Sequence, residues 1–271
     1  MTFDAPLHAA FFACAAVAAF AWLTSIVTGN FSQVDRLWSI VPPLYVAWFA
    51  AQAGFHDARL DLMAALSTVW GARLTYNFAR KGGYRPGSED YRWPALRARM
   101  GPAVFHVFNV VFIASYQNFI LLLLALPAWA AFEHRGAPLG ALDVVAAGGF
   151  LVLLVGETVA DEQQWRFQRD KKARRERGEP IVAEFVTDGL FRWSRHPNFF
   201  CEQGMWWMIY LFSVAAGAGW LNVTIAGPVL LTLLFQGSTA FTERLSLSKY
   251  PSYAAYQRAT SRLLPLPSRR R

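Results

Sequence analysis

The chain has 271 residues, of which 55% are hydrophobic and only 16% are charged. That apolar share exceeds the usual range of soluble domains, so the composition predicts an all-α integral membrane protein with a single polytopic domain over residues 1–271. The net charge of +8 could indicate a nucleic-acid partner. However, the Lys and Arg residues lie between the apolar segments, where membrane orientation explains them better. We therefore expect no nucleic-acid partner.

Membrane-length apolar segments follow one another along the chain. A span needs roughly 20 mostly apolar residues, and the sequence predicts about seven transmembrane helices. The first five are expected at residues 7–27, 37–55, 60–78, 104–132 and 139–159. The sixth and seventh are expected within residues 199–241, with a break near 217–222. Pro42 and Pro43 predict a kink in the second span.

The loops predict the orientation of these spans. Opposite loops hold little more than Arg59 and Arg135, whereas most Lys and Arg residues fall in residues 29–36, 80–102, 160–198 and 243–271. Cytoplasmic loops are enriched in Lys and Arg, so we expect the N-terminus outside and the C-terminus in the cytoplasm. The first residues lack the basic region of a signal peptide, which favours an uncleaved first span. The tail 268–271 is expected to contact anionic membrane lipids.

Two polar clusters precede the sixth predicted span. The first, residues 80–99, combines arginines suited to phosphate with Tyr84, Tyr91 and Trp93, and it is either a solvated loop or a ligand wall. The second, residues 161–177, continues the fifth span into the cytoplasm. There Arg166 and Arg169 are about one turn apart and can face one ligand. Residues 171–177 are expected to be solvated or to face lipid.

The most informative stretch is GLFRWSRHPNFFCEQGMWW, residues 189–207, which follows an expected turn at Asp188. It sets Arg192, Arg195 and His196 before an apolar segment that carries Glu202. Charges at the mouth of a membrane helix are costly to bury, so we expect a phosphate-bearing or otherwise polar ligand there. A later cluster, ERLSLSKYPSYAAY at residues 243–256, reads equally as a helix cap with an interfacial aromatic belt.

Ionisable and amide groups inside the predicted membrane region are functional candidates by default. Mutual neutralisation, for example of Arg73 by Asp35 or Glu202, is an equally good explanation. The residues in question are Asp35, Arg73, Gln117, Asn118 and Glu202.

The segments LFRWSRHPNFFCE and ERLSLSKYPSYAAY resemble the C-terminal region of steroid 5-alpha-reductases and of a bacterial membrane protein family called DUF1295. GSEDYRW and WGARLTYNFARKGG are similar to the same bacterial family, and together the motifs cover roughly residues 35–265. Isoprenylcysteine carboxyl methyltransferases and phospholipid methyltransferases share a similar RHP segment and a similar late segment.

The resemblance implies a seven-helix fold that binds NADPH from the cytoplasmic side, with residues 160–265 as the cofactor-binding region. Asp161 could exchange its role with Glu162, because the register is uncertain by one residue. The resemblance assigns the cofactor to Arg80, Asp161, Arg169, Arg195, His196, Asn198, Glu202, Arg244 and Tyr253.

The catalytic residues depart from the reductase pattern. Steroid reductases carry a Gln-Glu pair on the second helix, where this chain has Val34 and Asp35, and a tyrosine that falls here near Val69 or Trp70. Asp35 or Tyr76 is therefore expected to donate the proton, although Tyr116 is another source of a phenol. An aspartate can donate only if desolvation raises its pKa.

The resulting hypothesis is an NADPH-dependent reductase of a carbon–carbon double bond in a lipophilic, steroid- or isoprenoid-like enone that enters from the bilayer. The expected location is a bacterial inner membrane, with the cofactor site facing the cytoplasm. The alternatives are an S-adenosylmethionine-dependent methyltransferase and a non-enzymatic lipid-binding protein. A transporter is less favoured because no inverted repeat is visible. The histidines are scattered, so no metal site is expected.

Overall fold

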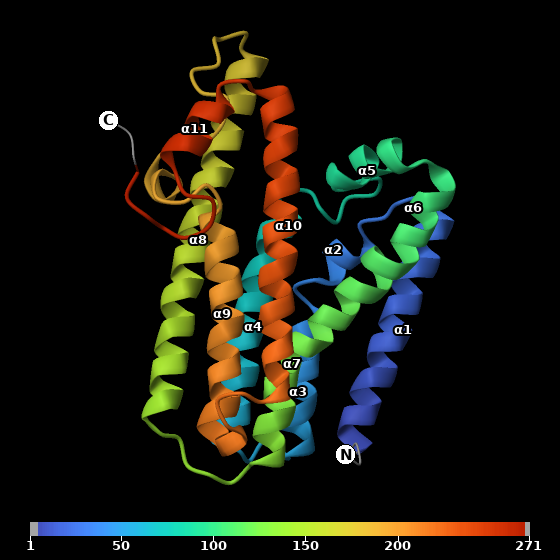
Figure 1. Ribbon diagram of the computed structural model, residues 1–271, viewed down its shortest axis with the longest axis vertical. Helices are drawn as coiled ribbons and strands as arrows, with labels where there is room; N and C mark the ends of the chain where they lie inside the picture. Colours follow the sequence, from blue (N-terminus) through green and yellow to red (C-terminus); the bar gives the residue numbers. More distant parts are fainter. Residues whose placement is uncertain (1–4, 269–271) are drawn as a thin grey trace. The chain divides into compact units, whose positions relative to one another are not determined.

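The computed structural model describes residues 5–268, and the regular secondary structure in this range is helical (Figure 1). The predicted all-α class is confirmed for these residues, and four helical segments, against the seven spans predicted, are long and apolar enough to cross a membrane, which fits a membrane protein. The predicted lipid-contacting tail lies, from residue 269 onward, outside the described range. The four segments are Ala5–Thr28, Pro102–Glu133, Ala141–Glu176 and Val223–Lys249.

The described chain forms two compact units. Unit 1 contains residues up to 148 together with 206–230, and unit 2 contains residues 149–205 together with the chain from 231 onward. The predicted cofactor region, residues 160–265, therefore lies in unit 2 except for residues 206–230.

Unit 1 is built around the long helical segment Pro102–Glu133. Its last section, α7 (Gln117–Glu133), is buried at every residue from 120 to 128, and it packs against α1, α3 and α4. The helix α1 buries only one face, and its other side exposes apolar residues suited to lipid. The remaining elements are α1 (Ala5–Thr28), α2 (Gln33–Leu37), α3 (Val41–Gln52), α4 (Ala58–Arg80), α5 (Arg92–Met100), α6 (Pro102–Phe108), η1 (Asn109–Tyr116), η3 (Val214–Ala218) and η4 (Val223–Ile225).

The kink predicted from Pro42 and Pro43 is wrong. The two prolines stand in the first turn of α3, where their missing N–H groups have no helical partner to lose. The regular helix is instead interrupted before α3, by the turn at residues 38–40. The predicted break near residues 217–222 is confirmed, because Gly217 and Gly219 have φ values of 104° and 83° and α10 begins at Ala226.

A buried ion pair fixes one end of unit 1. Asp57 caps α4 through the backbone N–H of Arg59 and also accepts from the Gly136 N–H at 2.9 Å. The Arg59 guanidinium donates to both carboxylate oxygens of Asp143, at 2.7 and 2.9 Å, and to the Pro138 carbonyl. The α3–α4 loop and the α7–α8 loop therefore lie at the same end of unit 1.

Polar loop contacts fix the other end of unit 1. Asn30 donates to the Ser88 carbonyl at 2.8 Å, and Glu89 accepts from the Phe31 N–H at 2.9 Å. The α1–α2 loop and the α4–α5 loop are thus joined, and α4 connects this end with the Arg59 end. Its 23 residues correspond to about 35 Å of helix, which is the thickness of a hydrocarbon core with a small margin.

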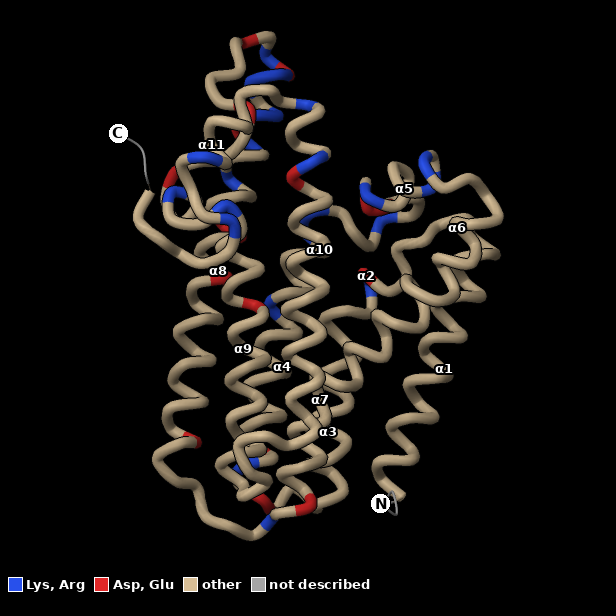
Figure 2. Tube along the Cα trace, in the orientation of Figure 1, with Lys and Arg blue, Asp and Glu red and all other residues tan. Residues whose placement is uncertain are grey.

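Unit 2 holds most of α8 (Ala141–Glu176), η2 (Gly189–Arg192), the first turns of α9 (Pro197–Ser213), most of α10 (Ala226–Lys249) and α11 (Tyr253–Ala259). The helix α8 has 36 residues, about 54 Å in length. It therefore extends well beyond a bilayer core, as predicted. Lys and Arg gather along the outer part of α8, which is residues 161–176 (Figure 2).

Candidate functional site

The two motif segments of unit 2, which begin near residues 190 and 243, meet in a buried ion pair. The paired residues are 48 positions apart in the sequence. The Arg195 guanidinium donates to both oxygens of the Glu243 carboxylate, at 2.6 and 3.0 Å. The side chains are only 9% and 6% exposed. Arg195 also donates to the carbonyls of Gln257 and Thr260. One arginine therefore connects the start of α9 with α10, α11 and the segment that follows α11.

Glu243 is the centre of this network. His196 lies 3.0 Å away through Nε2, and the Gln257 amide donates to the second carboxylate oxygen at 2.8 Å. A carboxylate with several donors is well compensated for its burial. From the sequence, Glu243 belongs to a cluster that reads equally as a plain helix cap, and its position at the centre of a network was not predicted. A glutamate directly after an apolar span was the available signal.

The end of the chain runs along the RHP segment. Backbone N–H groups of Arg195 and His196 donate to the carbonyls of Ser261 and Arg262, at 2.9 and 3.1 Å. The fully buried Ser194 hydroxyl donates to the Leu263 carbonyl at 2.8 Å. These bonds hold residues 193–196 in one conformation just before α9 begins at Pro197.

The other predicted cofactor residues of unit 2 differ in exposure. Asp161 on α8 and Glu202 on α9 are buried, at 4% and 9% exposure, while Arg169 and Arg244 are exposed. Asn198 is half-buried in the first turn of α9, four residues before Glu202 and hence on the same helix face. Tyr253 is buried with its ring 4.9 Å from that of Phe185.

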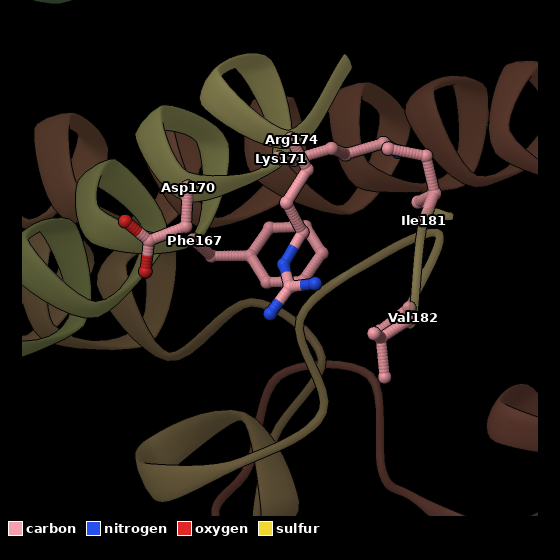
Figure 3. Close-up of a pocket in the computed structure, with 7 residues that line it drawn as sticks. Phe167, Asp170, Lys171, Arg174, Ile181 and Val182 are labelled. Carbon is pink, nitrogen blue, oxygen red and sulfur yellow. The ribbon is translucent and has the colours of Figure 1, made fainter. Parts of the chain in front are cut away.

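A cavity of about 120 Å³ lies at the outer end of α8 (Figure 3). One wall is α8, and the other is the extended loop that follows it. Lys171 holds this loop by donating to the Glu184 carbonyl and, at 3.2 Å, to the Tyr250 hydroxyl. From the sequence, residues 171–177 are expected to be solvated or to face lipid, whereas two of their cations line this pocket. The lining residues are Phe167, Asp170, Lys171, Arg174, Ile181, Val182 and Ala183.

Asp35, a predicted catalytic residue, lies in the loop network of unit 1. Its carboxylate accepts from the Trp93 indole at 2.8 Å and lies 3.7 Å from Arg92. The side chain is 14% exposed. Burial raises the pKa of the Asp35 carboxyl above its ordinary value, and this outweighs the opposing effects of Arg92 and Trp93. A raised pKa is what an aspartate proton donor requires.

Tyr76, the other predicted catalytic residue, is 66% exposed on α4. The Arg80 guanidinium lies 5.6 Å from the centre of its ring and donates to the Asn77 amide oxygen at 3.0 Å. The predicted cofactor residue Arg80 and the predicted catalytic residue Tyr76 therefore lie side by side. Asp35 instead has Trp93 and Arg92 as its partners. Within residues 5–268, no group of three or more His, Cys, Asp or Glu side chains could hold a metal ion.

These features define an all-helical membrane protein with a buried Arg–His–Glu network and a basic outer helix end. The chain belongs to the family described as "Protein of unknown function (DUF1295)", which matches residues 21–260. It is 40% identical over 258 residues to an uncharacterized protein of Schizosaccharomyces pombe, covering 90% of this chain and 75% of the relative. This relative is fungal, so the restriction to bacteria has no support. No solved structure matches the chain.

Proposed function

We propose that the protein is a membrane-embedded reductase that uses NADPH to reduce a carbon–carbon double bond in a lipophilic, steroid- or isoprenoid-like enone. The observation that carries this proposal is the buried Arg195–Glu243 pair. It joins the two separate motifs that resemble the steroid 5-alpha-reductases. Motifs that fold into one network support a shared task, which in those reductases is cofactor binding.

The residues of unit 2 suit a nucleotide cofactor. Phosphate groups require cations with free donors, and Arg169 offers an exposed guanidinium on α8. Arg195 was predicted to hold phosphates, but four of its hydrogen bonds go to Glu243, Gln257 and Thr260. We assign Arg195 and His196 to positioning the start of α9, where Asn198 and Glu202 stand.

NADPH would supply the hydride chemistry, and the protein would supply orientation and charge. Asp35 would donate its proton to the carbonyl oxygen as the enolate develops, because its burial favours the protonated form. The resulting enol would become the saturated ketone by transfer of a proton to its α-carbon. Tyr76 is the alternative proton donor. The substrate would enter from the bilayer, which suits an apolar molecule and the lipid-exposed side chains of α1 and α8.

The proposed topology has seven spans, with the N-terminus outside and the C-terminus in the cytoplasm. To the four apolar segments it adds α4, the predicted second span at residues 37–55 with α3, and α9 with η3 (residues 197–218). The latter two cover 19 and 22 residues, enough for about 30 Å of helix. The cofactor side would then face the cytoplasm, in an inner membrane if the source is bacterial.

The test is ligand-dependent thermal stabilisation of the detergent-purified protein, comparing NADPH with S-adenosylmethionine. A ligand that binds only the folded state, at 100 times its dissociation constant, adds about 2.7 kcal/mol. We expect a shift with NADPH alone and its loss in Asn198→Ala. A shift with S-adenosylmethionine alone would replace the reductase by a methyltransferase. No shift with either ligand, for a folded sample, would favour a lipid-binding protein.

A further inference from the structure

The pocket at the outer end of α8 has a composition that indicates a particular ligand. Lys171 and Arg174 contribute positive charge, and Phe167 contributes an aromatic face. Ile181 and Val182 form an apolar wall on the loop, although Val182 is 81% exposed to water. An apolar wall beside cations suits a ligand that carries both a ring system and a phosphate group.

The distance of the pocket from the apolar part of α8 distinguishes a soluble ligand from a lipid headgroup. The apolar part of α8 ends at Ala160, so Phe167 and Arg174 lie about 10 and 21 Å farther along the helix axis. The headgroup region of one leaflet is about 5–8 Å thick. If α8 stands roughly upright, Arg174 extends past the headgroups, which favours a ligand that arrives from the water phase.

Asp170, the acidic residue of the pocket, further restricts the class of ligand that can bind. Asp170 lines the same cavity and would repel a bare phosphate, but it can accept a hydrogen bond from a neighbouring hydroxyl. A phosphate next to a hydroxyl on one ribose satisfies both Arg174 and Asp170. The cavity volume of about 120 Å³ suits one such phosphate group rather than a whole nucleotide.

We infer that this pocket binds the 2′-phosphate at the adenosine end of NADPH, so that it selects NADPH over NADH. The inference rests on the proposed NADPH-dependent function and adds a specificity site to it. Arg174 provides the decisive charge, because the ammonium of Lys171 is already engaged by Glu184 and Tyr250. The interaction of Arg174 with Glu179 is long, at 3.6 Å, and both side chains are about 40% exposed, so the guanidinium can turn toward a phosphate.

The experiment compares NADPH and NADH binding to the full-length protein in detergent for the wild type, Arg174→Gln and Arg175→Gln. Arg175 is the matched control, since it is an exposed cation on the same helix that does not line the pocket. We expect Arg174→Gln to weaken NADPH binding about tenfold or more, as for the loss of a charge-assisted hydrogen bond, and to leave NADH binding unchanged. Arg175→Gln should change neither by more than about twofold.

Each result has a definite meaning. If the wild type binds NADPH but both variants behave alike, the phosphate subsite is overturned while the proposed function stands. If the wild type binds neither nucleotide, the proposed function fails, and this inference fails with it.

A second arm uses nanodiscs of phosphatidylcholine with and without phosphatidylserine. The inference is overturned if NADPH and NADH bind equally well and if phosphatidylserine or inorganic phosphate competes with NADPH only when Arg174 is present. The pocket would then be a general anion site.

Discussion

At the scale of single residues, Glu243 is expected to contribute strongly to stability. Glu243→Gln leaves Arg195 and His196 without their carboxylate, and breaking one partner of a buried ion pair costs about 3–5 kcal/mol. We expect a large fall in the melting temperature in mild detergent. Glu176→Gln is the control, because that glutamate pairs with Lys172 at 3.7 Å on the surface, where a pair is worth about 1 kcal/mol or less. Equal falls in the two variants would contradict this role of Glu243.

Asp35 gives a prediction on pH. Its pKa is raised in the folded protein, so the folded state holds this proton more tightly than the unfolded state. The wild type therefore has its full stability below the ordinary carboxyl pKa of about 4 and loses it as the pH rises through the folded-state pKa. Asp35→Asn does not titrate, so its stability relative to the wild type should increase across this range. A difference that stays constant with pH would rule out a raised pKa.

At the scale of elements, Gly71 allows α4 to approach the start of α3. A Cβ atom at Gly71 would overlap the Ser39 carbonyl oxygen and the Pro43 ring, and the Ser39 and Thr75 hydroxyls lie 2.7 Å apart beside it. Gly71→Ala should therefore destabilise the protein by about 1–3 kcal/mol, although alanine is the better helix former. The control Gly148→Ala adds its methyl to open space and should be neutral or stabilising. A neutral Gly71→Ala would show that α3 and α4 can separate without loss.

The helix ends also show what the sequence could and could not predict. Hydropathy and charge predicted the length of α8, and the loop residues around Gly217 predicted the break before α10, because both signals are local. Glu243 could not be assigned, because its partner Arg195 is 48 residues away and only folding brings them together. The pocket at Arg174 could not be predicted for the same reason. Its loop wall is held by Lys171 through contacts that no local pattern encodes.

At the scale of the molecule, contacts within unit 1 support one part of the proposed topology, the crossing of α4. Asp57 and Gly136 are joined at one end, and Asn30 and Ser88 are joined at the other, so α4 must run between two opposite ends. If these ends are the two membrane faces, α4 spans the bilayer despite Arg73 near its middle. The α3–α4 loop and the α7–α8 loop then face the outside, together with the start of α1.

Cysteine labelling with a membrane-impermeant thiol reagent tests this arrangement. The native Cys14 and Cys201 are both buried, which keeps the background low. We expect His56→Cys and Ala137→Cys, both exposed loop positions, to be labelled in intact cells. Arg175→Cys should react only after the membrane is opened, because about 51 Å of α8 separates it from Ala141. If His56→Cys were labelled only in opened cells while Ala137→Cys was labelled in intact ones, the two loops would lie on opposite faces. That result would contradict both the crossing of α4 and the hydrogen bond between Asp57 and Gly136.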